Sequence, residues 1–342
     1  MAKNIVGIDF GNDRMKIVHM KNGVFKKFAM ADVPEGMISH DKINNPKEVA
    51  RFIGDTLKKE GINAKDAAII MAGENVYVKV IEMPQMSEQD LRINLPFEFR
   101  DYITSDTQNY VYDYAIINND LDVHEVIIND DGEEITTTRK MMKLTAVAAP
   151  LEEVELYRDV LKEAGLRMVK LAPKQYALMG IIRSIQKDLK YNDEEYCVID
   201  LGYDSIRMYM MRDDELIASR ELDGLKELLY VLEQALEVTR KDAKAALINN
   251  TDNCQELPSC IEYYSNVTVG LMRALNFYHF SHPESRLKDV YIYGGGAEIK
   301  SLLEEINNNV ELDIHLTNEL PDSFNELKEL SSYVSAVGII LD

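Results

Sequence analysis

The opening of the chain alternates short apolar runs with turn residues, the pattern of a strand meander. Apolar runs typical of strands cover Asn4–Asp9, Met15–Met20 and Val24–Phe28. The last two runs are separated by Lys21-Asn22-Gly23, and Asn-Gly between two strand patterns is a strong hairpin signal. The opening therefore predicts three strands joined by tight turns.

A helix and two further strands follow. Apolar residues recur at helical spacing within Lys47–Glu60, and Gly61 ends that pattern. The runs Ala67–Ala72 and Val76–Ile81 have the composition of strands. We therefore expect residues 1–82 to form a sheet with a helix packed on it.

The pattern changes after Met83. Ser87 is placed as the N-cap of a helix over Glu88–Asn94. The elements expected next are the strands Tyr110–Ile117, Val123–Asn129, Glu134–Lys140 and Met142–Ala149 and the helix Glu152–Ala164. This block predicts a small α+β module inserted into the first domain.

The second half begins with an acidic link, Tyr191–Glu195, which we expect to be exposed. The elements expected after it are the strands Tyr196–Asp200 and Asp289–Tyr293 and the helices Gly224–Glu237, Arg240–Leu247 and Cys260–His279. The apolar segment Ser331–Leu341 is expected to return and pack on an earlier domain.

One motif occurs twice in register. Ile8-Asp9-Phe10-Gly11-Asn12-Asp13 is followed by Lys16, and Ile199-Asp200-Leu201-Gly202-Tyr203-Asp204 is followed by Arg207. Glycine at the tip of such a turn lets backbone N–H groups gather around phosphate oxygens. An aspartate at the end of the first strand can hold a magnesium ion or its water. Two such hairpins facing each other would clamp a nucleotide.

A third glycine motif lies near the end of the chain. Gly294-Gly295-Gly296 follows an apolar strand and precedes a helix expected over Lys300–Ile306. Unhindered backbone at a helix start suits a phosphate or a ribose. The motif does not fit the dinucleotide fingerprint of Rossmann folds, and the chain has no Walker P-loop.

Composition narrows the partners. The chain has 38 Lys and Arg against 59 Asp and Glu, a formal net charge of −21, which excludes a surface built to follow nucleic acid. No cluster of Lys and Arg is seen along the sequence, which argues against docking on anionic lipid. No apolar run reaches the roughly 20 residues needed to cross a bilayer, and no secretory signal is present. Any membrane link therefore requires another protein.

Other chemistry finds little support. The three cysteines have no metal-ligand spacing and fit a reducing cytoplasm as small buried residues. The histidines form no ligand pair, and no nucleophile motif occurs.

Two hairpin phosphate loops and a late strand-Gly-Gly-Gly-helix, in that order, resemble the actin-like ATPase superfamily, which includes actin, hexokinase and FtsA. Within it the chain resembles the PilM family of type IV pilus assembly proteins. The segments that carry this narrower likeness are Gly7–Gly11, Lys16–Val18, Ile81–Pro84, Leu91-Arg92, Asp113-Tyr114, Leu144–Pro150, Leu161–Leu166, Gly224–Leu247, Gly294–Leu303 and Ala336–Ile340.

The resemblance implies an α/β, actin-like (ribonuclease H-like), two-lobed ATPase fold with an inserted subdomain of the FtsA and PilM type. The first lobe would comprise residues 1–82, 165–190 and 331–342, and the inserted subdomain residues 83–164. The second lobe would comprise residues 191–223 and 288–330, with a helical cleft subdomain at 224–287.

The resemblance also implies ATP and Mg²⁺ between the lobes. The residues expected at the nucleotide are Gly11, Asn12, Asp13, Lys16, Gly202, Tyr203, Asp204, Ser205, Gly294, Gly295, Gly296 and Glu298. Asp9 and Asp200 would hold the metal or its waters.

The partner implied by the resemblance is the cytoplasmic tail of a PilN-like inner-membrane protein, bound in a groove beside the inserted subdomain. Such a protein would lie in the cytoplasm and reach the inner face of the membrane through this partner. Self-association, and the choice between a pilus, a secretion system and a related filament, are left open.

Three departures from the family pattern leave the enzyme question open. Asp13 would repel phosphate unless it points away or meets the metal, and the connecting segment carries Lys174 where relatives often have a carboxylate that positions water. Ala243-Lys244 and Leu247 stand where relatives tend to have acidic and lysine residues of the adenine pocket. The chain is at most a slow ATPase. The alternatives are an FtsA-like division filament, a kinase of the same fold, or an actin-like scaffold that binds no nucleotide.

Overall fold

The computed structural model describes residues 4–39, 42–71, 76–104, 106–128, 134–189, 195–213, 215–316 and 330–341. By its internal contacts the chain divides into two units. The larger unit comprises Met1–Met71 and Leu161–Asp342, and the smaller comprises Ala72–Val160. Each is described by itself.

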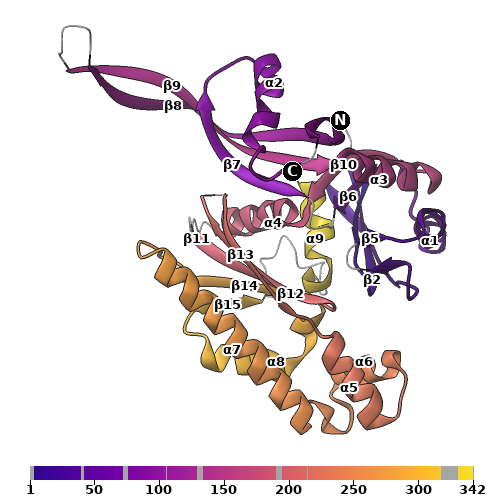
Figure 1. Ribbon diagram of the computed structural model, residues 1–342. Helices are drawn as coiled ribbons and strands as arrows, with labels where there is room; N and C mark the ends of the chain where they lie inside the picture. The colour runs from indigo at the N-terminus through magenta and orange to yellow at the C-terminus, as the bar shows by residue number, and fades with distance from the viewer. Residues whose placement is uncertain are drawn as a thin grey trace. The chain divides into compact units, whose positions relative to one another are not determined.

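The first sheet of the larger unit has five strands. They are β1 (Asn4–Phe10), β2 (Arg14–Lys21), β3 (Val24–Asp32), β6 (Asp66–Met71) and β10 (Arg167–Pro173). Their order is β10-β6-β1-β2-β3, with β1 antiparallel to β2 and parallel to β6 (Figure 1). The predicted hairpin at Lys21-Asn22-Gly23 is confirmed, because Lys21 pairs with Val24 across it. Two short strands, β4 (Ile38–Ser39) and β5 (Lys42–Ile43), pair separately.

The second sheet repeats this topology. Its strands are β11 (Glu195–Leu201), β12 (Ser205–Arg212), β13 (Glu215–Asp223), β14 (Asp289–Tyr293) and β15 (Asp313–Leu316). The order is β13-β12-β11-β14-β15, and β11 is antiparallel to β12 and parallel to β14. The duplicated sequence motif therefore begins two sheets of the same construction.

Helices cover both sheets. The helices of the larger unit are α1 (Pro46–Lys59), α4 (Lys174–Leu189), α5 (Lys226–Leu236), α6 (Arg240–Asn249), α7 (Pro258–Ser281), α8 (Lys300–Asn309) and α9 (Leu330–Leu341). Short 3₁₀ helices cover Thr251–Glu256 and Gly295–Glu298. One hydrophobic core contains side chains of α4, α9 and the inner faces of both sheets. A second core contains side chains of the helices α5, α6, α7 and α8 and of the far face of the second sheet (Figure 1).

The C-terminal helix α9 makes the closest of these contacts. A Cβ at Gly7 of β1 would lie 2.0 Å from the Ala336 carbonyl oxygen, and a Cβ at Gly338 would lie 1.9 Å from that of Ala177 in α4. No side chain fits at either distance, so glycine is what allows α9 to contact strand and helix backbone together. The apolar segment at the end of the chain is thus part of the central core.

The smaller unit contains a three-stranded antiparallel sheet. Its elements are β7 (Tyr77–Pro84), α2 (Glu88–Glu98), a 3₁₀ turn (Thr107–Asn109), β8 (Tyr110–Ile128), β9 (Glu134–Pro150) and α3 (Leu151–Glu163), the last of which ends in the larger unit. The strands expected at 110–117 and 123–129 form one strand with irregular pairing near Asn118, and those expected at 134–140 and 142–149 form another.

The boundary between the first lobe and the inserted subdomain, expected after residue 82, lies earlier in the structure. Strand β7 was expected to belong to the first lobe, but it pairs with β9 from Tyr77 to Pro84. Its Ile81 and Met83 side chains pack in the core of the smaller unit. The division therefore falls before β7, since the backbone hydrogen bonds of this strand are made within the smaller unit.

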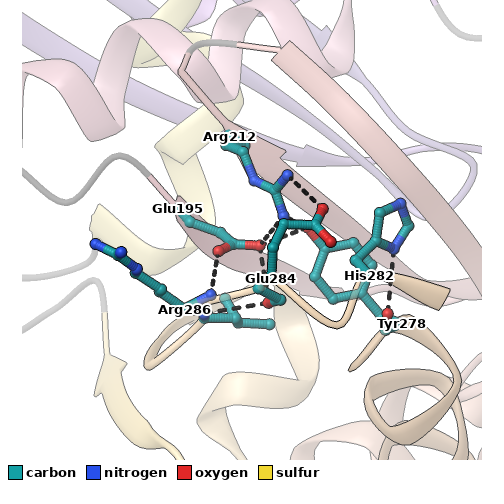
Figure 2. A network of polar contacts seen from close by, with 8 residues as sticks. Glu195, Arg212, Tyr278, His282, Glu284 and Arg286 are labelled. Atoms are coloured by element: carbon teal, nitrogen blue, oxygen red, sulfur yellow. Dashed lines mark hydrogen bonds and ion pairs between the residues drawn. The ribbon is translucent and has the colours of Figure 1, made fainter. Parts of the chain in front are cut away.

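Glu195 corrects another expectation. The acidic link was expected to be exposed, and residues 190–194 lie outside the described part, but the Glu195 side chain is only 7% exposed. Its carboxylate accepts hydrogen bonds from the Tyr278 hydroxyl (2.6 Å), the Arg212 guanidinium (2.9 Å) and two donors of the Ser285-Arg286 turn (Figure 2). Burial alone would raise its pKa, yet these donors lower it below the usual value. The start of β11 is thereby tied to α7.

The three cysteines, Cys197, Cys254 and Cys260, are free thiols and all are buried. Burial raises the pKa of Cys197 to about 12, so this thiol is inert at neutral pH.

The contact of Gly338 with α4 predicts that Gly338→Ala destabilises the protein by about 2 kcal/mol or more, because backbone must move to admit the methyl group. Gly54→Ala in α1 is the matched control, since a Cβ there meets its nearest atom at 3.6 Å. The free energy of unfolding of this control should rise by about 0.5–1 kcal/mol, because alanine has a higher helix propensity than glycine. Urea unfolding followed by circular dichroism measures both, and equal stability of the two variants would contradict the close contact.

The hydrogen bonds of Glu195 predict that removing its charge lowers the free energy of unfolding by an amount that depends on pH. Glu195→Gln should lower the free energy of unfolding at pH 7 by about 1–3 kcal/mol. The folded pKa is depressed, so the stability contributed by the ionised carboxylate is full above the unfolded pKa of about 4.3 and is lost as the pH falls through the folded pKa. The gap between wild type and variant should therefore close below about pH 4. Glu304→Gln on the exposed side of α8 should show no such gap at any pH.

Candidate functional site

The two copies of the repeated motif form equivalent hairpins. In the first, Asp9 of β1 pairs with Lys16 of β2, and in the second Asp200 of β11 pairs with Arg207 of β12. The Gly11 N–H donates to the Arg14 carbonyl oxygen at 3.1 Å, which closes the first turn. Each turn therefore follows an aspartate and is followed by a cation at the same register.

Glycine is required in the second hairpin. A Cβ at Gly202 would lie 2.4 Å from the Ser205 carbonyl oxygen. Gly294, which lies against Asp200 and Leu201 of the same hairpin, has a φ of 99°. A Cβ on Gly294 would lie 2.6 Å from an Asp200 carboxylate oxygen. The strand ends and the late glycine motif thus approach one another without side chains between them.

One cavity collects residues from both hairpins. The sequence-predicted residues that line it are Asp9, Gly11, Asn12, Asp13, Lys16, Asp200, Gly202, Tyr203, Asp204, Ser205 and Gly295. A Cβ at Gly295 would meet nothing within 4 Å, so this position faces open space.

Three predicted residues lie behind the cavity rather than on its lining. Gly294 faces Asp200, and Gly296 packs on Leu201. Glu298 accepts a hydrogen bond of 2.8 Å from the Ser332 hydroxyl of α9. These three residues are absent from the lining, so their contact with nucleotide stays a prediction.

Charge in the cavity is almost balanced. The lining carries five cations and four carboxylates, although acidic residues dominate the chain. Lys16 lies 3.6 Å from Asp9, and Lys174 lies 2.5 Å from Asp200. Each aspartate at a strand end therefore has its own lysine.

Asp13 also has a cation partner. Its carboxylate accepts a hydrogen bond from Lys244 of α6, and Arg14 lies 3.8 Å away. The repulsion expected from Asp13 is thereby reduced, because its charge is compensated by residues of the same cavity.

The pKa values of Lys174 and Lys244, which are both partly buried, move in opposite directions. Burial disfavours the charged form of Lys174, but attraction to Asp200, with smaller contributions from Tyr293 and Asp9, raises its pKa well above normal. Burial lowers the pKa of Lys244, and Asp13 opposes this only in part. Lys174 is therefore a fixed positive charge at neutral pH.

Two contacts cross the cavity. Asn12 of the first hairpin donates to the Asp204 carboxylate of the second, and Lys244 reaches Asp13 from α6. The cavity has a volume of about 120 Å³. Pockets for small molecules usually measure roughly 300–1,000 Å³, so these contacts hold the cavity in a narrow state.

One wall of the cavity is apolar. Leu225 and Leu229 of the α5 region, Leu247 and Ile248 of α6, and Ile299 form it. A cavity with polar hairpins at one side and aliphatic side chains at the other suits a ligand with a charged end and a flat apolar end.

No group of three or more metal-ligating side chains occurs among the described residues. Asp9 and Asp200 provide two carboxylates on the lining. Mg²⁺ commonly uses one or two protein carboxylates and takes its other ligands from phosphate and water. The residues therefore fit a magnesium ion that arrives with a phosphate ligand.

Sequence reasoning placed Lys174 at the position where relatives often have a water-positioning carboxylate, but it missed the ion pairs of Lys174 with Asp200 and of Lys244 with Asp13. Lys174 is the first residue of α4, directly after β10 ends at Pro173, and ligand sites of such sheets gather at the carboxyl ends of strands. That signal supports its position at the site. The contact of Lys244 with Asp13 has no local signal, because Lys244 reaches Asp13 only through the packing of α6.

Solved structures show the fold. The PilM-PilN type IV pilus biogenesis complex is similar with a TM-score of 0.72 and 19% identity, over 99% of this chain and 98% of that chain. The ethanolamine utilization protein EutJ from Carboxydothermus hydrogenoformans has a TM-score of 0.59 and 12% identity, over 98% and 88%. MreB 5 of Spiroplasma citri bound to AMPPNP has a TM-score of 0.54 and 9% identity, over 99% and 95%. The predicted actin-like, two-lobed fold is confirmed.

The sequence also matches a family model. The model is described as type IV pilus assembly protein PilM, and the match runs from residue 7 to residue 333. Because the match covers nearly the whole chain, this protein belongs to the PilM family of type IV pilus assembly proteins.

Proposed function

We propose that this protein is an ATP-binding platform of the type IV pilus inner-membrane assembly complex and that it binds the cytoplasmic tail of a PilN-like membrane protein. Membership of the PilM family supports the role in pilus assembly. The similar complex contains PilM together with PilN, which supports a partner of that kind. Among the described residues, no helix is long and apolar enough to cross a bilayer. Recruitment to the inner face of the membrane would then come from the partner.

The observation that carries nucleotide binding is the meeting of two equivalent hairpins at one cavity. Phosphates would lie against the backbone of Gly11 and Gly202, with Lys16 and Ser205 as further donors. The base would lie on the apolar wall around Leu229. Mg²⁺ would be held by Asp9 and Asp200 and would neutralise phosphate charge.

Lys174 argues for a static rather than a rapid use of ATP. Fast hydrolysis needs a group that aligns the attacking water. The first turn of α4 contains no acidic residue, and Lys174 there is paired with Asp200. We therefore propose that bound ATP stabilises the protein in a form that holds its partner.

A scaffold that binds no nucleotide is the second candidate. The Asn12–Asp204 and Lys244–Asp13 contacts favour it, because both must open before a triphosphate enters. Calorimetric titration with ATP decides between the two.

The tail is proposed to contact the smaller unit on the exposed side of α2. Ile93 and Phe97 lie four residues apart on this helix, 58% and 48% exposed, while Leu91 and Leu95 face the core of the unit. Apolar side chains at this spacing suit a short amphipathic segment.

Gly295→Ala should weaken ATP binding without unfolding the protein, because the added Cβ lies at the cavity and meets no protein atom within 4 Å. We expect calorimetric affinity at least about tenfold weaker, a change of about 1.4 kcal/mol or more. An unchanged melting temperature without ATP is the control. ATP affinity equal to that of wild type, with or without Mg²⁺, would contradict the assigned cavity.

Phe97→Glu should weaken binding of a synthetic PilN-like tail at least about tenfold while ATP affinity is unchanged, since a charge replaces an apolar contact. Phe280→Glu in α7 is the control, because Phe280 is 84% exposed and lies in the larger unit. Fluorescence anisotropy with a labelled tail measures both. Failure of the wild-type protein to bind the tail, with or without ATP, would defeat the platform.

A further inference from the structure

A second hollow lies at the opposite edge of the first sheet from the candidate nucleotide cavity. It has a volume of about 670 Å³. Its lining residues, which we call the basic hollow, are Asn4, His19, Lys21, Lys26, Lys27, Gly61, Asn63, Lys65, Asp66 and Arg167. Five of the ten are Lys or Arg and one is acidic, in a chain whose net charge is −21.

The topology of the sheet gathers these residues. Strands β1, β6 and β10 are parallel, so their first residues, Asn4, Asp66 and Arg167, meet at one edge. The β2–β3 hairpin turns at the same edge and brings Lys21 there. Asp9 lies five residues along β1 from Asn4, about 17 Å away at strand spacing. The basic hollow is therefore separate from the nucleotide cavity.

Most of the positive charge there is uncompensated. Arg167 is paired with Asp66 at 2.7 Å, and Lys27 donates to the Glu60 carbonyl oxygen. Lys21, Lys26 and Lys65 are exposed and make no ion pair within the described ranges. Three like charges gathered without counter-charges repel one another, and an anion between them would relieve that repulsion.

His19 provides a buried polar group at the hollow. Its side chain is 8% exposed, and its Nε2 lies 2.7 Å from the Asn4 side-chain oxygen. Its Nδ1 is buried and has no hydrogen-bond partner in the described part of the chain. Burial first, and then Lys21, Lys27 and Lys26, lower the pKa of His19. A bound anion would oppose the effect of these lysines on the pKa of His19.

We propose that the basic hollow binds a compact multivalent phosphoryl anion, either as a free phosphate ester or as a phospholipid headgroup. Four separate stretches of chain bring cations to one concave site, which favours several charges on a small group over an extended chain. Phosphoryl groups place two charges and three acceptor oxygens on one centre.

Binding to the purified full chain is tested with two probes. Inorganic pyrophosphate represents the free anion, and phosphatidylcholine vesicles with and without phosphatidic acid, whose headgroup is a phosphate monoester, represent the headgroup. The variant Lys26→Glu/Lys65→Glu should bind at least about tenfold more weakly, since each charge near an anionic surface is worth about fivefold. The control Lys288→Glu/Lys300→Glu makes the same charge change at exposed lysines outside the hollow and should bind as wild type.

The His19 ring gives a local readout that binding at the nucleotide cavity would not move. Its pKa, followed by proton NMR of the imidazole, should rise when the anion binds. If the variant Lys26→Glu/Lys65→Glu loses affinity for pyrophosphate, the ligand is a free phosphoryl anion. If it loses affinity only for vesicles with phosphatidic acid, the ligand is a phospholipid headgroup. The proposal is wrong if neither probe binds, if both double variants weaken binding equally, or if the His19 pKa does not move. Lys21→Glu is a second variant, to be used if the double variant does not fold.

Discussion

The contact of α9 with backbone on two sides is the constraint on which the larger unit depends. Gly7 lets the helix lie directly on β1, and Gly338 lets α4 lie directly on the helix. Side chains of both sheets then share one core with α4 and α9. Because the sheets are held through this core, the hairpins that begin them meet at one cavity. Ser332 of the same helix also lines the cavity and bonds Glu298.

The ion pairs between the lining aspartates and lysines determine whether the cavity can accept an anionic ligand. A strongly acidic chain would repel a triphosphate, but each aspartate at a strand end is paired with a lysine and Asp13 with Lys244. The same pairing narrows the cavity, so nucleotide entry and the cross-cavity contacts exclude each other. Under the proposed function, phosphate would replace these internal ion pairs, and modest free energies would then decide occupancy.

The basic hollow is locally positive, although the net charge of the whole chain is strongly negative. The net charge excludes a polyanion-binding surface that extends over the whole chain. This inference concerns the charge averaged over the chain and not the charge of one part of the surface. Lys21, Lys26, Lys65 and Arg167 are separated along the chain, and only strand pairing brings them to one edge. The sequence analysis found no cluster of Lys and Arg along the chain, and the cluster on the folded surface could not be predicted in that way.

Sequence alone determined the opening strands, the paired hairpins and the actin-like order of motifs, because turns and alternating apolar residues are local signals. It also identified most residues that line the cavity. It did not predict the strands β10, β13 and β15. Only the tertiary structure decided that β7 joins the smaller sheet, that Glu195 is buried, and that Lys174 and Lys244 neutralise the cavity. These depend on contacts between residues distant in sequence, and strand partners and ion pairs of that kind leave no mark in local periodicity.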